Sequence, residues 1–178
     1  LHFSPKKTMM MAQKLYEQGY ITYMRTDSRT YSKEFISKAK KFIEQKWSTD
    51  YVNKNIYALN QRKTTKSKKT ENAQEAHEAI RPTDIKRQTL SSNTDSSQKR
   101  LYDLIWSNTV ESCMSSAEYN LLSAKITAPD THWYKYSAEL ITFPGWLIVR
   151  GYDKESPIYN FILTLRQKQV VRYYKIQS

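Results

Sequence analysis

The spacing of apolar residues changes once along this 178-residue chain, from a helical period to a two-residue period near Tyr119. Before that point apolar side chains recur three and four residues apart, which is typical of amphipathic helices. From Tyr119 they alternate with polar residues, as in strands that bury one face. The change predicts an α+β protein with a mainly helical domain at residues 1–118 and an antiparallel β segment at residues 119–178.

The first predicted helix has signals at both ends. Ser4 is a suitable N-cap, Pro5 a suitable first helical residue, and Gly19 a suitable left-handed C-terminal cap. Lys6 and Lys7 would lie in the first turn, where the helix dipole disfavours positive charge. A bound phosphate would relieve this conflict, so the two lysines are candidate phosphate contacts; a solvated pair of lysines is the simpler alternative.

Two further helices are expected in the same domain. One spans about residues 32–47, and its apolar face consists of Phe35, Ile36, Ala39, Phe42 and Ile43. The other begins at Asp95, where Gln98 completes a sequence that resembles a capping box, and ends near residue 116. Alanine and glutamate favour a short helix at residues 73–81, which Pro82 would end.

The β segment is expected to contain four or five strands. Alternation is clear at residues 119–128 and 134–140, with a Pro-Asp turn between them. Further apolar or alternating runs follow at residues 146–149, 159–165 and 170–176. Because turn residues separate the runs, an antiparallel sheet is the predicted arrangement.

Charge and cysteine content limit the partners and the compartment. The formal net charge of +12, from 29 Lys and Arg against 17 Asp and Glu, predicts an acidic partner such as nucleic acid or an anionic membrane surface. No apolar run approaches the ~18 residues that a membrane span needs. The single cysteine, Cys113, excludes an intramolecular disulfide and a cysteine-rich zinc site, and it fits a reducing compartment. Residues 60–72, with five cations and one acid, are expected to form an exposed, mobile loop.

One segment, GYITYMRTDS at residues 19–28, combines residues that suit chemistry on a phosphodiester. Side chains alternate faces in an extended segment, so Tyr23 and Arg25 are expected to point the same way. A guanidinium can bind two phosphate oxygens through parallel hydrogen bonds, and a cation beside a phenol favours its nucleophilic phenolate form. The pair therefore suits attack at phosphorus, although a Tyr-x-Arg pair also occurs as surface packing on a strand.

The part of this segment that reads ITYMRTDS resembles the active-site tyrosine signature of the type IA DNA topoisomerases. Two flanking blocks are similar to the same family, KKTMMMAQKLYE at residues 6–17 and QEAHEAIRPTD at residues 74–84. The three blocks occur in the order of the bacterial topoisomerase I pattern and at about its separation, and a weaker similarity continues to the C-terminus. The chain is therefore identified as a fragment of a type IA topoisomerase that carries the active-site tyrosine.

The resemblance implies roles for individual residues. Tyr23 would be the catalytic nucleophile and Arg25 would hold the scissile phosphate. His77 and Arg81 would contact phosphate or the DNA backbone, and the histidine is also suited to proton transfer. The complete set of further candidates for active-site or DNA contacts is His77, Arg81, Thr22, Asp27, Lys6 and Lys7.

The resemblance also implies a fold and an activity. The tyrosine domain would be related to winged-helix proteins, and the β segment would form part of the arch that moves this domain. The complete enzyme would cleave and religate single-stranded DNA through a 5′-phosphotyrosine, and so relax negative supercoils without ATP. Its Toprim domain, which this chain does not match, would hold Mg²⁺ with acidic residues. No metal site is therefore expected in this fragment, and the fragment is expected to be inactive alone.

The expected partners are single-stranded and negatively supercoiled DNA and the remaining domains of the same polypeptide, without a membrane. The expected location is the cytoplasm, with nucleoid association in a bacterium. The main alternative is a non-catalytic DNA-binding module of winged-helix type, in which Tyr23 is structural. A tyrosine recombinase would need an Arg-His-Arg set in a larger helical domain, and a nicking enzyme would need a histidine-rich metal motif; the sequence contains neither pattern.

Overall fold

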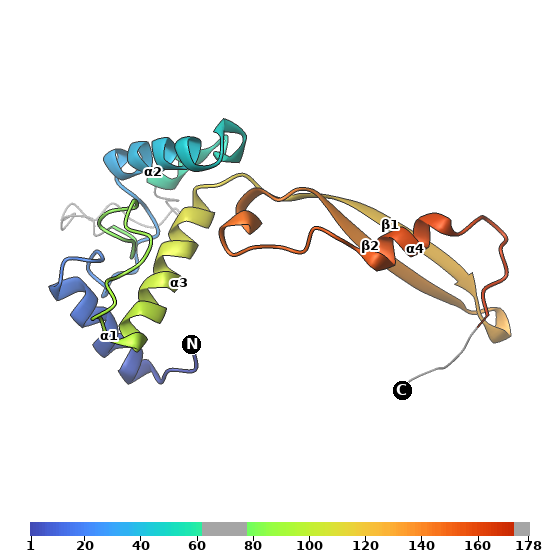
Figure 1. The fold of residues 1–178 in the computed structure, drawn as a ribbon, viewed down its shortest axis with the longest axis horizontal. Coiled ribbons are helices and arrows are strands. Elements are labelled where there is room, and N and C mark those ends of the chain that lie inside the picture. Colours follow the sequence, from blue (N-terminus) through green and yellow to red (C-terminus); the bar gives the residue numbers. More distant parts are fainter. Residues whose placement is uncertain (62–77, 173–178) are drawn as a thin grey trace, which may run out of the picture. The chain divides into compact units, whose positions relative to one another are not determined.

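The computed structural model describes residues 1–61 and 78–172, and contacts divide the chain into two units (Figure 1). Residues 1–116 and 145–150 form the first unit, and residues 117–144 with the chain from residue 151 onward form the second. The domain boundary placed between residues 118 and 119 stays a prediction. The basic loop expected at residues 60–72 lies almost entirely outside the described residues.

Helix α1 (Pro5–Glu17) begins and ends at the predicted signals. The side chain of Ser4 caps its first turn. At the other end Gly19 has a φ of +72°, and the N–H groups of Gly19 and Tyr20 donate to carbonyl oxygens of the last turn at 2.8 and 2.9 Å. This pattern is a Schellman motif, in which a left-handed glycine lets the chain reverse after the helix. The turn directs the chain into the segment that carries Tyr23.

Helices α2 (Lys33–Lys46) and α3 (Ser96–Ser112) confirm the other two long helices. Ser32 caps α2, and all five residues of its predicted apolar face are buried. Asp95 caps α3 by accepting hydrogen bonds from two N–H groups of the first turn, and the helix ends before the predicted residue 116. The first unit also contains the short 3₁₀ helices η1 (Thr49–Tyr51) and η2 (Ile56–Asn60), and its helices enclose one hydrophobic core.

The apolar run at residues 146–149 was predicted as a strand, and this prediction is wrong. It forms the 3₁₀ helix η4 (Gly145–Val149), which packs against α3 in the first unit. Gly145 has a φ of +49° and lies against the backbone carbonyl groups of Ser115 and Ser116. Arg150 then donates to the carboxylate of Glu111 at 2.6 Å. A run of four apolar residues is compatible with either structure, and here the helical core covers it.

The second unit contains a two-stranded antiparallel sheet of β1 (Glu118–Thr127) and β2 (Trp133–Phe143), joined through η3 (Pro129–Thr131). Helix α4 (Pro157–Thr164) lies along this hairpin and packs Tyr159 and Ile162 against Ala138 (Figure 1). The helical unit and the two strands confirm the α+β class.

The prediction of four or five strands is wrong for the described part of the chain. The expected strand at residues 159–165 is mostly α4, because Ser156 caps a helix and Pro157 starts it. Residues 170–172 have no regular structure, and residues 173–176 lie outside the described range. No helix among the described residues is both long and apolar enough to cross a membrane.

Candidate active site around Tyr23

The segment after Gly19 pairs with a segment far along the chain. Ile21 and Pro82 form an antiparallel bridge. The N–H of Thr22 donates to the carbonyl oxygen of Arg81 at 2.9 Å, and the N–H of Thr83 donates to that of Tyr20 at 3.0 Å. Two of the three blocks that carry the family resemblance are therefore joined through their backbones.

The side chain of Thr22 extends this pairing. Its hydroxyl donates to the carbonyl oxygen of Ala79 at 2.8 Å and accepts the N–H of Arg81 at 3.0 Å. Thr83 makes the reciprocal contact by donating to the carbonyl oxygen of Gly19 at 2.7 Å. Thr22, a candidate for an active-site or DNA contact, is thus bonded through its side chain and its backbone to residues 79–81, directly before Tyr23.

These bonds also explain a wrong secondary-structure prediction. A helix was expected at residues 73–81, but residues 78–81 are not helical, and residues 73–77 lie outside the described range. Ala79 donates its N–H to the carbonyl oxygen of Thr30 at 2.8 Å, and Arg81 donates to Thr22. Tertiary partners thus use the N–H groups that a helix would have used, which propensity alone does not foresee.

Tyr23 lies on the surface next to a buried residue, Met24. Its side chain is 36% exposed, whereas that of Met24 is 5% exposed and belongs to the core. The ring of Tyr16, near the end of α1, meets the ring of Tyr23 edge to face at a centroid distance of 5.2 Å. Arg25, which follows the buried Met24, is also exposed, and the common direction of Tyr23 and Arg25 stays a prediction.

Arg81 has a different environment from that expected of a phosphate contact. Its side chain is 13% exposed, and it forms an ion pair with Glu78, to which its Nε donates at 2.7 Å. A terminal nitrogen donates to the carbonyl oxygen of Pro82 at 3.0 Å, and the guanidinium lies 4.2 Å from the centroid of the Phe35 ring. Glu78 also accepts the N–H of Ser32, the cap of α2, at 2.9 Å. This pair therefore connects the Tyr23 segment to α2.

A second tyrosine beside this network is structural. Tyr31 is 8% exposed, and its hydroxyl forms a 3.1 Å hydrogen bond with the hydroxyl of Ser112. Burial raises the pKa of Tyr31 above its ordinary value, although the hydrogen bond to Ser112 lowers it in part. A buried neutral phenol is poorly placed to reach a substrate, so Tyr23 is the candidate nucleophile of the two.

The two lysines among the remaining candidates lie away from Tyr23. Lys6 and Lys7 lie in the first turn of α1, so about 15 Å of helix separates them from the end of α1 that leads to the Tyr23 segment. Asp27 is exposed. His77 lies outside the described residues.

Two contacts in this site were missed by sequence reasoning. One involves Glu78, whose two carboxylate oxygens accept hydrogen bonds from the N–H of Ser32 and from Arg81. Its position three residues before Arg81 is a spacing at which ion pairs form, and this was the available signal. The packing of Tyr16 on Tyr23 had no signal, because it depends on the turn after α1.

The described residues contain no group of three or more His, Cys, Asp or Glu side chains placed to hold a metal ion.

Comparison with known proteins places the chain in a family. A family model described as DNA topoisomerase matches residues 1–177. The chain belongs to the bacterial DNA topoisomerase I family. This confirms the resemblance carried by the three sequence blocks.

Members of the topoisomerase family resemble this chain in both sequence and structure. The chain is 42% identical over 162 residues to DNA topoisomerase 1 of Haemophilus influenzae, covering 88% of this chain and 17% of that protein. It is 44% identical over 154 residues to DNA topoisomerase 1 of Mycolicibacterium smegmatis, covering 83% and 16%. The structure of full-length topoisomerase I from Thermotoga maritima superposes with a TM-score of 0.67 at 30% identity, covering 88% of this chain and 26% of that one. The chain thus spans about a sixth of the length of the curated relatives it matches.

Proposed function

We propose that this chain carries the nucleophilic tyrosine of a type IA DNA topoisomerase, and that Tyr23 attacks a phosphodiester in single-stranded DNA. The observation that supports this most is the placement of Tyr23, an exposed phenol whose neighbours on both sides are fixed. Thr22 is tied to residues 79–81 by hydrogen bonds, and Met24 is buried in the core. A nucleophile held in this way spends little entropy in reaching its target.

In the proposed reaction the phenolic oxygen of Tyr23 forms a bond to phosphorus, and the bond from phosphorus to the 3′ oxygen of the DNA breaks. The phenolic proton is lost, and the 3′ oxygen gains a proton as it leaves. Because the new 5′-phosphotyrosine is also a diester, the reverse reaction religates the strand without ATP. Strand passage through the open break would relax negative supercoils.

Arg25 is the proposed phosphate ligand. It is exposed and follows Tyr23 by two residues, and among the described residues it has no ion pair. Its guanidinium is therefore available to donate two hydrogen bonds to the non-bridging oxygens, where negative charge builds up. Arg81 is proposed as a positioning residue instead, since a phosphate contact would require its guanidinium to leave Glu78.

The proposals on the metal ion, the fold relation and the location follow from the family. We propose that Mg²⁺ is held by acidic residues outside this chain, because the described residues do not offer such a cluster. No step above is assigned to the metal. Further proposals follow from the family in the same way. The first unit would be related to winged-helix proteins, and the hairpin would form part of an arch. The location would be cytoplasmic, and DNA would be contacted by Lys6, Lys7, Asp27 and His77.

Covalent trapping on labelled DNA tests the nucleophile. The chain would be mixed with Mg²⁺ and a single-stranded oligonucleotide, alone and with the remaining polypeptide of a DNA topoisomerase 1 relative, and then denatured in detergent. A 5′-phosphotyrosine keeps the 3′ part of the strand, so a 3′ label should move with the protein and a 5′ label should not. We expect this adduct in the mixture, and its loss in Tyr23→Phe.

Tyr57→Phe is the matched control, because Tyr57 is 53% exposed on η2 in the same unit. It should leave the adduct unchanged, while Arg25→Ala should slow its formation. An adduct that persists in Tyr23→Phe would refute the assignment of the nucleophile. Salt-sensitive DNA binding with no adduct in any mixture would support the non-catalytic DNA-binding module instead.

A further inference from the structure

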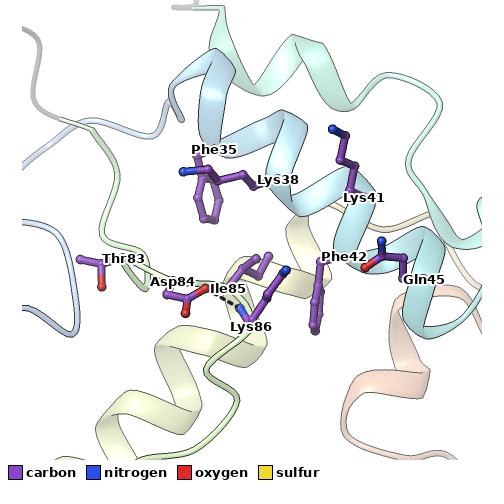
Figure 2. A pocket seen from close by; sticks show the side chains of 9 residues that line it. All are labelled: Phe35, Lys38, Lys41, Phe42, Gln45, Thr83, Asp84, Ile85 and Lys86. Atoms are coloured by element: carbon purple, nitrogen blue, oxygen red, sulfur yellow. Dashed lines mark hydrogen bonds between the residues drawn. The ribbon is translucent and has the colours of Figure 1, made fainter.

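A pocket of about 390 Å³ lies between α2 and residues 83–86, which follow directly after the bridge to the Tyr23 segment (Figure 2). Its apolar lining consists of Phe35, Phe42 and Ile85. Its charged lining consists of Lys38, Lys41, Lys86 and Asp84. We propose that this pocket binds one unstacked nucleotide of the single strand on which Tyr23 acts. This inference rests on the proposed function and adds a binding site to it.

The size and the lining of the pocket suit a nucleobase. Sites for small ligands occupy about 300–1,000 Å³ and are mostly apolar with a few polar groups. Phe35, Phe42 and Ile85 are only 3%, 8% and 3% exposed, so the core holds them in place. The ring of Phe42 is fixed further by an edge-to-face contact with Trp106 at 6.1 Å. The hollow is therefore rigid, and a base that enters it removes apolar surface from water.

The charged residues of the pocket suit the phosphate of the same nucleotide. The lining contains three lysines and one carboxylate, that of Asp84, which accepts the backbone N–H of Lys86 at 3.0 Å (Figure 2). Lys38 is already paired with Glu34 at 2.7 Å. Lys41 and Lys86 have no ion pair among the described residues, so they are the groups available to a phosphate.

The pocket is braced by the same residues as the Tyr23 segment. Phe35 lines the pocket, and its ring also packs against the guanidinium of Arg81, which lies 4.2 Å from the ring centroid. Thr83 lines the pocket and donates its hydroxyl to the carbonyl oxygen of Gly19. A strand held in the pocket is therefore held at a fixed position relative to the backbone of Tyr23. The base must leave a helical stack to enter, which selects single-stranded DNA.

Binding of labelled oligo(dT) to the chain, followed by fluorescence anisotropy, tests the phosphate contacts. Lys41→Ala and Lys86→Ala should each weaken binding about fivefold at 0.1 M salt and reduce the salt slope by about 0.7, as expected for one lost phosphate contact. Lys40→Ala is the matched control, because it removes the same charge from the neighbouring position of α2 outside the pocket lining. It should change the affinity less than twofold. Equal effects of Lys40→Ala and Lys41→Ala would overturn the proposal.

Photo-cross-linking tests the position of the base. An oligonucleotide carrying 4-thiothymidine should cross-link to the tryptic peptides that contain Phe42 or Ile85, and the cross-link should be lost in competition with unlabelled oligo(dT). A duplex of the same sequence should not cross-link there. Free thymidine monophosphate should compete only at far higher concentration, because it has no further contacts with the chain; equal competition would mean that the pocket takes free nucleotides and would overturn the assignment to a strand.

The two proposals fail separately. Tyr23→Phe removes the covalent adduct but should leave the pocket cross-link in place. Lys41→Ala weakens binding, but any adduct that forms should still depend on Tyr23. Cross-links confined to other peptides, together with a normal Tyr23-dependent adduct, would refute the pocket and leave the nucleophile standing.

Discussion

Replacing Thr22 by valine removes one hydroxyl from the centre of the contact between residues 19–22 and 79–83 and keeps the shape of the side chain. The hydroxyl donates to the carbonyl oxygen of Ala79 at 2.8 Å, with a longer contact of 3.4 Å to that of Arg81, and it accepts the N–H of Arg81 at 3.0 Å. A hydrogen bond contributes about 1 kcal/mol net, and a buried group left without a partner costs about 1–3 kcal/mol. Because both groups are only partly buried, we expect Thr22→Val to destabilise the first unit by about 2 kcal/mol.

Urea unfolding followed by tryptophan fluorescence measures this loss. Trp47 and Trp106 lie in or against the core of the first unit, whereas Trp133 of the second unit is 63% exposed, so the signal reports mainly the first unit. With a slope of about 2 kcal/mol per M urea, the midpoint should fall by about 1 M.

Thr22→Ser is the control, since it keeps the hydroxyl and loses only a partly buried methyl group. It should cost about 0.5 kcal/mol. If the two variants unfolded at the same urea concentration, the hydroxyl would not hold the two segments together. The adduct should also form more slowly in Thr22→Val than in Thr22→Ser at temperatures where both variants are folded.

Three further predictions concern positions away from Tyr23. Gly145→Ala should destabilise the first unit more than Gly19→Ala in thermal melts, because both glycines have positive φ but only at Gly145 would a new Cβ overlap the carbonyl oxygen of Ser116. Gly19→Ala should cost about 1 kcal/mol, from backbone strain alone. Cys113, the only cysteine, is fully buried, and burial raises its pKa to about 11, so a thiol reagent at pH 8 should modify it far more slowly in buffer than in urea. Burial raises the pKa of Tyr102 to about 12, above the ~10 of an unfolded chain. The folded state therefore retains this proton longer, and about 2–3 kcal/mol of stability present below pH 10 should be lost between pH 10 and 12; melts of Tyr102→Phe should depend less on pH in that range.

Helices whose ends are set by local residues could be predicted from the sequence. Ser4 and Gly19 mark α1 and Asp95 caps α3 as expected, and α2 lies within its predicted range of about residues 32–47, with Ser32 as its cap. Each of these signals acts within one turn of the backbone, so distant contacts do not alter it. The five-residue apolar face of α2 was predicted completely for the same reason, since one amphipathic helix has one way to bury it.

The β segment shows where the period of apolar residues is ambiguous. Tyr159 and Phe161 are two positions apart, which suggested a strand, but Tyr159 and Ile162 are three apart and form the buried face of α4. Both patterns are present in an eight-residue helix that is apolar on most sides, so the cap at Ser156 and Pro157 was the better signal. Phe161 is apolar but 54% exposed, so apolar character alone does not show which face of α4 is buried.

The candidate site could be predicted only in part. The sequence predicted that Tyr23 and Arg25 point the same way, and the structure exposes both of them on either side of the buried Met24. The non-helical backbone of residues 78–81 was not foreseen, because their composition favours a helix. The reason lies almost 60 positions away, in the hydroxyl and backbone of Thr22.

The two arginines of the site differ in exposure, and this difference separates their proposed roles. The exposed guanidinium of Arg25 has no ion pair among the described residues, so it breaks no ion pair there when it binds a phosphate. Arg81 is 13% exposed between Glu78 and the ring of Phe35, and its removal would leave a partly buried carboxylate without its charge partner. Because of that cost, Arg81 is expected to stay in place while DNA binds and leaves. A fixed position is what its proposed role in positioning Tyr23 needs.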